Sequence, residues 1–257
     1  MHLLDRVALV TGSDSGIGQA TATELAREGA DVVVTFRRDE DGAAATRSQV
    51  EALGRRAIAV QADLTDEGAV ERLFDRAVGS FGRVDILVNN AGVNGTGVEI
   101  VDMETATWDR AMRTNLYGYF FCARRFARER RAAGGGGRII NITSIHDEAP
   151  SPGNAEYDTT KGGQQMLTRT LALELAPLRI TVNAIGPGMI LTPMNQASVE
   201  DPAVRERHAA KIPLERAGTP AEVARLVVYL ASDDAAYVTG TTVYIDGGLM
   251  RVQARGA

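Results

Sequence analysis

Residues 6–18 read RVALVTGSDSGIG, a short apolar run that leads into a turn with glycines at 12, 16 and 18. The run predicts a buried β-strand, and the apolar spacing in residues 18–29 predicts that a helix follows at once. In such a turn Gly12, Gly16 and Gly18 permit a sharp reversal, a close approach of the backbone to a pyrophosphate, and close packing of helix on strand. The helix N-terminus adds N–H donors for an anion. The stretch predicts a dinucleotide site, and a turn that is merely tight is the alternative.

The same strand-then-helix order continues along the chain. Short runs rich in Val and Ile predict six further strands, at residues 31–36, 57–63, 85–92, 138–144, 180–188 and 241–248. Segments with helical spacing separate them, at residues 42–54, 67–82, 103–133, 155–177 and 220–232. Strands that are apolar on both faces and alternate with helices predict a doubly wound α/β fold, in which helices cover both faces of a parallel sheet.

The sequence shows no sign of a second domain. A length of 257 residues suits one α/β unit, so we expect a single domain over residues 1–257. The GGGG run at residues 134–137 leads directly into an expected strand, which favours a helix-to-strand turn over a domain boundary. Residues 189–211 form the one long connection that breaks the alternation, and we expect them to act as a substrate lid.

Composition argues against several classes of protein. The net charge of −5 disfavours a surface that neutralises nucleic-acid phosphates, and the arginine-rich run at 124–131 suits a solvated or subunit-facing helix end. The single cysteine, Cys122, cannot form an intrachain disulfide. No run reaches the roughly 18 apolar residues of a membrane span, and no secretory signal is visible. The three histidines lack ligand spacing, so we expect no metal. A cytoplasmic enzyme or binding protein is expected.

The end of the second expected strand bears on which dinucleotide binds. An acidic residue there would accept hydrogen bonds from the adenosine ribose and repel a 2′-phosphate, but the chain has Phe36 followed by Arg37 and Arg38. Two guanidinium groups suit a phosphate, which favours NADP(H); NAD(H), or use of both, is the alternative. The arginines would otherwise only balance the acidic residues 39–41. Asp63, which ends the third strand, is a candidate acceptor for the adenine amino group.

The stretch YDTTK, residues 157–161, places a tyrosine four residues before one of the two lysines among 28 Lys and Arg residues. If this segment is helical, Tyr157 and Lys161 lie on one face. We expect the ammonium to favour the phenolate and to lower the tyrosine pKa toward the range of a general base. A chance pairing is the alternative. Ser144 ends the preceding strand, at the sheet edge where ligands bind, and its hydroxyl is placed to hold a substrate oxygen.

Taken together, these motifs resemble the short-chain dehydrogenase/reductase family. The motifs are TGSDSGIG at 11–18, NNAG at 89–92, Ser144 with Tyr-x-x-x-Lys thirteen residues later, and PG at 187–188. The likeness covers essentially the whole chain. It implies a seven-stranded Rossmann-type sheet, a homotetramer, and catalysis by Asn115, Ser144, Tyr157 and Lys161. Asn115 would bend a helix and position a water that completes a proton relay through Lys161.

The resemblance also implies which residues hold the cofactor. Residues 90–92 would run along it, and Thr192 would contact its carboxamide or phosphates. The expected cofactor set is Gly12, Ser15, Gly16, Ile17, Gly18, Arg37, Arg38, Asp63, Leu64, Asn90, Ala91, Gly92, Tyr157, Lys161, Pro187, Gly188, Ile190 and Thr192. The chain departs from the family at residues 13–15, where Ser-Asp-Ser replaces the basic residue that members preferring NADP(H) often carry.

Such a site would interconvert an alcohol and a carbonyl by reversible hydride transfer with nicotinamide. Tyr157 would exchange the proton while Ser144 holds the substrate oxygen. Substrate choice is expected from the loops after the fourth and fifth strands and from the lid, which carry mostly polar residues. The expected substrate contacts are Asn94, Ser144, His146, Tyr157 and Met189. For His146, a plain surface position is the alternative.

These loops are similar to those of the bacterial glucose 1-dehydrogenases within the family, above all SIHDEAPSP at 144–152 and NAIGPGMILTPMN at 183–195. A sugar or polyol dehydrogenase is therefore the first hypothesis, although AGVNGTG at 91–97 lacks an acidic residue for a sugar hydroxyl. A reductase of 3-oxoacyl groups or small ketones is the second. A protein that senses NAD(P) without turnover is a third, of another class.

Overall fold

The seven apolar runs form one parallel sheet with the strand order β3-β2-β1-β4-β5-β6-β7. The computed structural model describes residues 1–195 and 199–252. Its strands are β1 Val7–Val10, β2 Asp31–Phe36, β3 Ala57–Gln61, β4 Ile86–Asn89, β5 Gly137–Ile142, β6 Ile180–Pro187 and β7 Thr242–Ile245. The strand order reverses between β1 and β4, which pair side by side, so a crevice opens at their carboxyl ends. The predicted doubly wound fold is confirmed.

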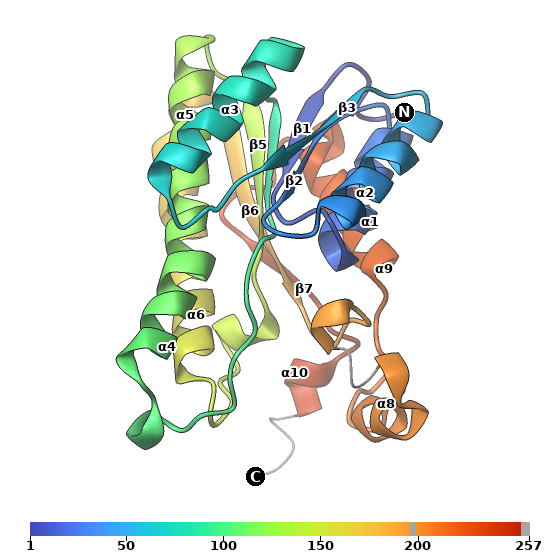
Figure 1. Ribbon diagram of the computed structural model, residues 1–257, viewed down its shortest axis with the longest axis vertical. Coiled ribbons are helices and arrows are strands. Elements are labelled where there is room, and N and C mark those ends of the chain that lie inside the picture. The colour runs from blue at the N-terminus through green and yellow to red at the C-terminus, as the bar shows by residue number, and fades with distance from the viewer. Residues whose placement is uncertain (196–198, 253–257) are drawn as a thin grey trace.

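Helices cover both faces of the sheet (Figure 1). They are α1 Gly16–Arg27, α2 Glu40–Ala52, α3 Glu67–Phe81, α4 Thr105–Ala111, α5 Gly118–Ala132, α6 Ala155–Leu175, α8 Pro202–Ala209, α9 Pro220–Ala231 and α10 Leu249–Val252. α1, α2 and α9 pack on one face, and α3, α5 and α6 pack on the other. None of the described helices has the length and apolar character that crossing a membrane requires.

The central strands are apolar in both directions because each face has its own helix layer. Every residue of β1, β2 and β4 is buried. Val34 points to the layer that contains Leu25 of α1, whereas its neighbour Val33 points to the layer that contains Phe74 of α3. Because side chains alternate along a strand, a continuous apolar run fills both cores, each buried Val or Leu contributing roughly 1.5–3 kcal/mol.

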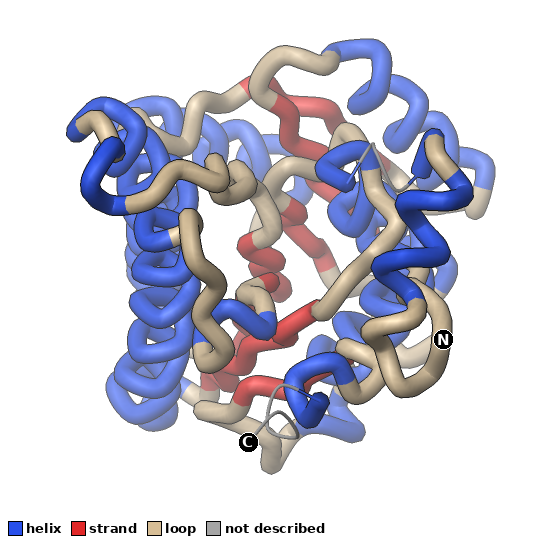
Figure 2. Tube along the Cα trace, turned by 90° about the horizontal axis from the view of Figure 1, so that it is seen from below, coloured by secondary structure: helices blue, strands red, loops and turns tan. Residues whose placement is uncertain are grey.

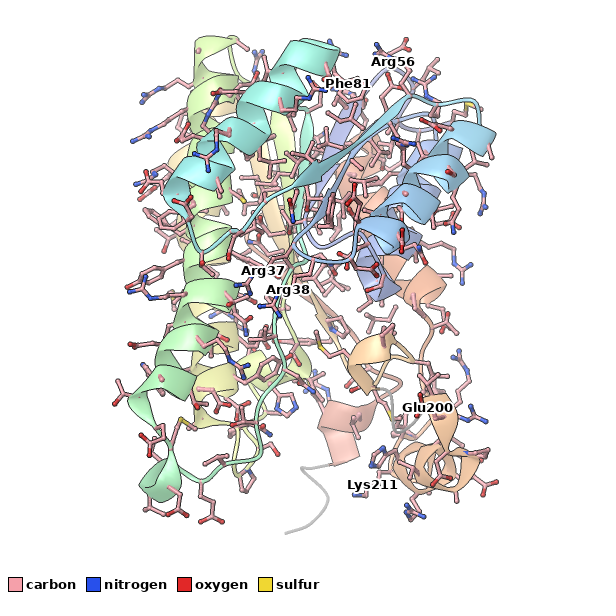
Figure 3. The ribbon with its side chains drawn as sticks, in the orientation of Figure 1. Arg37, Arg38, Arg56, Phe81, Glu200 and Lys211 are labelled. Atoms are coloured by element: carbon pink, nitrogen blue, oxygen red, sulfur yellow. The ribbon has the colours of Figure 1, made fainter. Side chains whose placement is uncertain are left out.

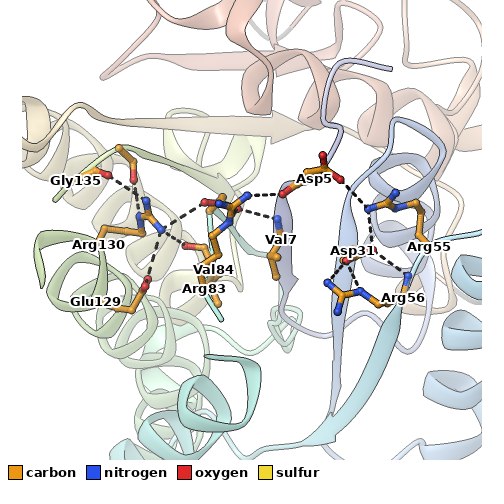
Figure 4. Close-up of polar contacts among 12 residues, drawn as sticks. Asp5, Val7, Asp31, Arg55, Arg56, Arg83, Val84, Glu129, Arg130 and Gly135 are labelled. Atoms are coloured by element: carbon orange, nitrogen blue, oxygen red, sulfur yellow. Dashed lines mark hydrogen bonds and ion pairs between the residues drawn. The ribbon is translucent and has the colours of Figure 1, made fainter. Parts of the chain in front are cut away.

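Buried carboxylates of the sheet gather at its amino edge, where arginines pair with them (Figure 4). Asp31 lies between Arg55 and Arg56, with N···O distances of 3.0 and 2.6 Å. Asp85 accepts from the backbone N–H of Val7 at 3.0 Å and pairs with Arg83 at 2.9 Å. Buried carboxylates need such partners, so these two have structural roles. In open α/β sheets, ligands bind at the opposite, carboxyl edge.

The loops after β4, β5, β6 and β7 reach the carboxyl edge, where α8 and α10 also lie, at the lower end of Figure 1. Seen from that edge, the strands run between the two helix layers and the loops surround their ends (Figure 2). The arginine-rich run lies on α5, and Arg124 and Arg125 pair with Glu67 and Glu71 of α3. Its charge is thus partly matched within the chain.

Candidate active site

Two adjoining cavities lie at the carboxyl edge of the sheet. The first has a volume of about 390 Å³ and extends from the glycine turn to Arg37 and Arg38. The second, of about 270 Å³, has Ser144, Tyr157 and Lys161 in its wall. The residues common to both walls are Ile17, Asn90, Gly92, Val93, Thr192 and Met194. A ligand long enough for both cavities would run from the end of β2 to Tyr157.

The glycine turn between β1 and α1 forms one wall of the first cavity. Gly12 and Gly16 have φ values of +59° and +56°, a left-handed conformation that favours glycine. A Cβ atom on Gly18 would lie 2.1 Å from the carbonyl oxygen of Gly12, so no larger residue fits there. Ser15 and Ile17 line the cavity at the start of α1. Each glycine of the motif thus has its own steric reason.

The N-terminus of α1 is suited to bind an anion. Its N-cap residue, Ser15, makes no side-chain capping hydrogen bond. The helices α2, α3, α8 and α9 are capped by the side chains of Asp39, Asp66, Asp201 and Thr219. Among the described residues, therefore, no N-cap side chain competes for the first N–H groups of α1, which carry the positive end of the helix dipole. A pyrophosphate fits this position.

The segment after β4 holds the glycine turn in place. The Asn90 Nδ2 donates to the carbonyl oxygens of Thr11 and Gly12, both at 2.9 Å. The buried Thr11 hydroxyl accepts from the backbone N–H groups of Asn90 and Ala91, at 2.8 and 3.0 Å. Asn90, Ala91 and Gly92 also line the first cavity. This segment therefore both forms the wall and fixes the turn opposite.

Arg37 and Arg38 follow β2 and lie on the same cavity wall (Figure 3). The Arg37 Nη2 is 2.9 Å from Asp63 Oδ2, so this guanidinium is already paired. Burial alone would raise the pKa of Asp63, but hydrogen bonds from Thr65 and Arg37 hold that pKa below its usual value. Among the described residues the Arg38 side chain has no ion pair, which leaves it available for a phosphate. Leu64 lines the cavity beside them.

Ser144, Tyr157 and Lys161 meet in the second cavity. Ser144 follows β5, and its Oγ accepts from the N–H of His146 at 3.2 Å, which leaves the hydroxyl proton available to donate. α6 carries Tyr157 and Lys161 on one face, with the lysine Nζ 5.4 Å from the centre of the tyrosine ring. The two side chains thus lie side by side, as their spacing predicts.

The pKa values of this pair differ from the expectation drawn from the spacing. Burial raises the pKa of Tyr157 to about 12, although a hydrogen bond with Ser144 works in the opposite direction. Burial lowers the pKa of Lys161 to about 7, against the charge of Asp147. The net shift of the tyrosine pKa is thus upward and not downward as expected, because burial disfavours the charged form and is the largest effect. Burial therefore favours the neutral form of both side chains.

Asn115 lies in a π-helical segment, Met112–Tyr117, that separates α4 from α5. Its Oδ1 accepts from the N–H of Val93 at 2.8 Å, and its Nδ2 donates to the Val93 carbonyl at 3.0 Å. Its own backbone carbonyl accepts a hydrogen bond from Gln164. The single helix expected at residues 103–133 is thus interrupted at the residue for which the family resemblance implied a bend, and such π segments often occur at functional sites.

His146 stands beside Tyr157 in the wall of the second cavity. The two rings meet edge to face, with 5.7 Å between their centres. The His146 Nδ1 is 3.4 Å from Asp158 Oδ1, and the other oxygen of Asp158 accepts from the N–H of Ser151 at 2.8 Å. His146 is therefore held against α6 and faces the cavity, rather than being a plain surface residue.

The connection after β6 completes the second cavity. Residues 187–190 line it, and Thr192 lines both cavities. Asn94, from the loop after β4, lines it as well. Of all the predicted site residues, only Gly18 and Asn115 do not line either cavity. Both contact residues that do: Gly18 packs against Gly12, and Asn115 accepts from the N–H of Val93. The structure therefore brings the whole predicted set to one edge of the sheet.

Three residues of this region were missed by the sequence reasoning. Thr11 fixes the glycine turn, Asp158 contacts His146, and Gln164 contacts Lys161. The contact of Gln164 could have been predicted, because a glutamine three residues after Lys161 lies on the same helical face. The contacts of the other two could not, because their partners come from distant loops. As for metals, no group of three or more His, Cys, Asp or Glu side chains in the described ranges is able to hold one.

Comparison with known proteins agrees with this geometry. Residues 12–250 match the family model described as enoyl-(acyl carrier protein) reductase. Glucose 1-dehydrogenase 2 of Bacillus subtilis is 38% identical over 247 residues, 96% of this chain and 95% of that protein. The 3β-hydroxysteroid dehydrogenase 1 of Eggerthella lenta is 43% identical over 248 residues, 96% of this chain and 94% of that protein.

A solved structure points the same way. Acetoin dehydrogenase from Enterobacter cloacae superposes with a TM-score of 0.87 at 42% identity, covering 96% of each chain. With the sheet order, the glycine turn and the Tyr157–Lys161 pair in place, the chain belongs to the short-chain dehydrogenase/reductase family and is an oxidoreductase.

Proposed function

We propose that the protein interconverts an alcohol and a carbonyl with a nicotinamide dinucleotide, and that its substrate is a sugar or another polyol. The observation that supports this most is the shared wall of the two cavities. A cavity suited to a dinucleotide, with the helix N-terminus for the pyrophosphate, adjoins one that contains the hydroxyls of Ser144 and Tyr157. The nicotinamide end of the cofactor would then meet the substrate at Tyr157.

The dinucleotide, when bound, supplies or accepts the hydride. The chain's own residues bind, orient and move the proton. In reduction, the Ser144 hydroxyl donates to the carbonyl oxygen, and Tyr157 transfers its proton to that oxygen as negative charge develops there. In oxidation, Tyr157 must first lose its proton, and the nearby ammonium of Lys161 favours the resulting phenolate. Asn115 and the π segment support this arrangement from behind.

NADP(H) is the cofactor that we favour, with Arg38 as the principal ligand of the 2′-phosphate. Its guanidinium is unpaired within the described residues, whereas Arg37 pairs with Asp63. Two carboxylates, Asp14 and Asp39, line the same cavity. Burial raises the pKa of Asp14. An ionised carboxylate in this wall would repel a 2′-phosphate, so a preference for NADP(H) would depend on the unpaired guanidinium of Arg38.

The polar part of the second cavity supports a hydroxylated substrate. The ring of His146, which lies next to Asp158, and the amide of Asn94 border the same space as the two catalytic hydroxyls. Such groups can bind hydroxyls next to the reacting carbon, as a sugar or polyol offers. The relatives named glucose 1-dehydrogenase and acetoin dehydrogenase act, by those names, on small hydroxylated molecules.

Purified protein tests this proposal. Rates with NADP+ and NAD+ are measured against aldoses and polyols, and rates with NADPH are measured against small diketones and a 3-oxoacyl thioester. We expect kcat/KM for the preferred sugar or polyol to exceed that for the ketones and thioester by at least tenfold. The reverse order would establish a ketone or acyl reductase instead. Cofactor binding without turnover of anything would establish a sensing protein.

Reduction of 3-oxoacyl groups or small ketones is the second candidate, and the rest of the cavity favours it. Part of the cavity wall is apolar and includes Val93, Met189, Ile190, Met194 and Leu249. A volume of about 270 Å³ suits a small ketone or the end of an acyl chain. The family model's description names a reductase of acyl carrier protein substrates.

We further propose that residues 189–211 act as a lid over a single domain that assembles as a homotetramer. Residues 196–198 of this segment lie outside the described residues. Ile190 near its start and Ile212 directly after its end are buried, whereas α8 between them buries none of its residues. Apolar side chains are exposed on the outer faces around α5 and α6, at Tyr117, Phe120, Met166 and Leu173. Light scattering after gel filtration should give four times the 27.4 kDa chain mass, and a monomer would contradict the assembly.

A further inference from the structure

Gln164 lies one helical turn beyond Lys161 on α6 and is completely buried. Its Oε1 accepts from the Lys161 Nζ at 3.2 Å, and its Nε2 donates to the backbone carbonyl of Asn115 at 2.5 Å. One carboxamide thus joins the ammonium on α6 to the π-helical segment. The reverse orientation would face its NH₂ toward the ammonium and its oxygen toward a carbonyl, so the amide is held in one direction.

One N–H donor of the Lys161 ammonium has no hydrogen-bond partner among the described residues. Its Nζ also donates to the backbone carbonyl of Ile142, at the end of β5, at 3.2 Å. An ammonium has three donors, and the described residues engage two of them. Lys161 is 5% exposed and lines the second cavity. The third donor is therefore the one available to that cavity.

We propose that Gln164 is a positioning residue that ties the Lys161 ammonium to the Asn115 carbonyl and keeps its remaining donor directed at the second cavity. The family resemblance implied a water in contact with Asn115 that continues a relay from Lys161. Here the Gln164 carboxamide also joins Lys161 to the Asn115 carbonyl, and a carboxamide neither releases nor takes up protons near neutral pH. The importance of Gln164 for turnover rests on the proposed function, whereas its effect on Lys161 does not.

Other groups around the ammonium stay the same when only Gln164 is changed. From α5, the ring of Tyr119 lies 5.9 Å from Nζ. From α6, the ring of Tyr157 lies 5.4 Å away. Asp147, in the turn after β5, acts through its charge and raises the pKa of Lys161. Against this background, Gln164→Met removes the acceptor and Gln164→Glu places a carboxylate next to the ammonium. Their effects on the lysine pKa must have opposite signs.

The lysine composition makes a direct measurement simple. Lys161 and Lys211 are the only lysines, so protein labelled with ¹³C at the lysine ε-carbon gives two signals, assigned with Lys211→Arg. Titration by NMR should place the Lys161 midpoint about one pH unit lower in Gln164→Met and about one unit or more higher in Gln164→Glu. The control is Gln165→Met. Gln165 is also buried on α6, but its amide donates to Glu148 and the Tyr244 hydroxyl, both at 3.0 Å.

Equal midpoints in the wild type and both Gln164 variants would overturn the proposal, as would a shift of the same size in Gln165→Met. If the methionine variant does not fold, the glutamate variant alone is decisive. The kcat/KM pH profiles of the two variants should also move in opposite directions. Shifted midpoints in a protein that turns over no substrate would leave the role of Gln164 intact and reject the proposed function.

Discussion

The imidazole Nδ1 of His146 lies 3.4 Å from the carboxylate Oδ1 of Asp158, the residue that directly follows Tyr157. Neither of these two atoms has a hydrogen-bond partner in the described structure, so their contact is a close approach of a charge pair rather than a hydrogen bond. The pair brings the turn after β5 next to the start of α6, with the His146 ring beside the Tyr157 ring. Asp158 therefore affects both the position of His146 in the wall of the second cavity and the pKa of Tyr157.

Replacing Asp158 with asparagine should change both. Asp158 is one of the charges that raise the pKa of Tyr157, so its removal lowers that pKa and the oxidation rate reaches half its maximum at a lower pH. Looser support of His146 should raise KM for a hydroxylated substrate severalfold, with cofactor affinity unchanged. Rate profiles from pH 6 to 11 test this. Asp109→Asn, an exposed change on α4, serves as the control, and identical profiles for the two variants would contradict the assignment.

Local signals made the fold and much of the site predictable. The glycine turn, the alternating strands and helices, and the four-residue spacing of Tyr157 and Lys161 each depend on neighbours in the sequence, and the structure has all three. A position such as Gly18 is restricted by the turn itself. Such features follow from short-range steric rules that one sequence already contains.

What could not be predicted depends on segments far apart in the chain. The partner of Asp158 comes from a turn twelve residues earlier, and the partner of Gln164 comes from a π segment 49 residues earlier. The direction of the Tyr157 pKa was mistaken for a related reason. Helical spacing shows that Lys161 is adjacent but does not show how dry the site is, and burial is the larger effect.

Removing the Tyr157 hydroxyl should abolish the reaction but not cofactor binding. Tyr157→Phe keeps the ring that packs against His146 and deletes only the proton donor. We expect kcat/KM to fall by about 10²- to 10⁴-fold, the usual contribution of a general acid or base, with the cofactor Kd within about twofold. Tyr237→Phe, at a fully exposed tyrosine, is the matched control. Full activity in Tyr157→Phe would reject the assigned proton donor.

Arg38→Ala should separate the two dinucleotides. Loss of the available guanidinium removes a charge-assisted contact worth about 1.5–3 kcal/mol, so the Kd for NADP+ should rise about 10- to 100-fold. The Kd for NAD+, which lacks the phosphate, should change little. Calorimetric titration of both cofactors, with Arg110→Ala on α4 as the control, gives the comparison. Equal losses for the two cofactors would show that Arg38 does not recognise the phosphate.

Thr11→Val tests how the glycine turn is held. Valine keeps the shape of threonine but removes the oxygen that accepts from the N–H groups of Asn90 and Ala91. Two polar groups without partners should lower the free energy of unfolding by about 2–4 kcal/mol and weaken cofactor binding. Urea denaturation measures the first effect. The exposed Thr105→Val should stay within about 0.5 kcal/mol of the wild type, and similar losses in both variants would show that the Thr11 contacts are unimportant.

Lys161 should make the protein less stable as the pH falls. Its pKa is about 7 in the folded chain against an ordinary value of 10.5, so between these values the unfolded chain binds more protons than the folded one. Stability contributed by this group therefore rises with pH across that window. Relative to the wild type, Lys161→Met should gain about 4 kcal/mol in free energy of unfolding as the pH is lowered from 10 to 6.

Urea denaturation at pH 6, 8 and 10 measures this difference, and the loss of the lysine's hydrogen bonds to Ile142 and Gln164 adds only a shift toward lower stability that is nearly the same at each pH. Lys211→Met removes the other lysine, which is exposed, and provides the matched control. A constant difference between Lys161→Met and the wild type would mean that Lys161 is charged throughout. That result would contradict the desolvation of Lys161 beside Tyr157. It would also contradict the conclusion that burial determines the pKa values of both side chains.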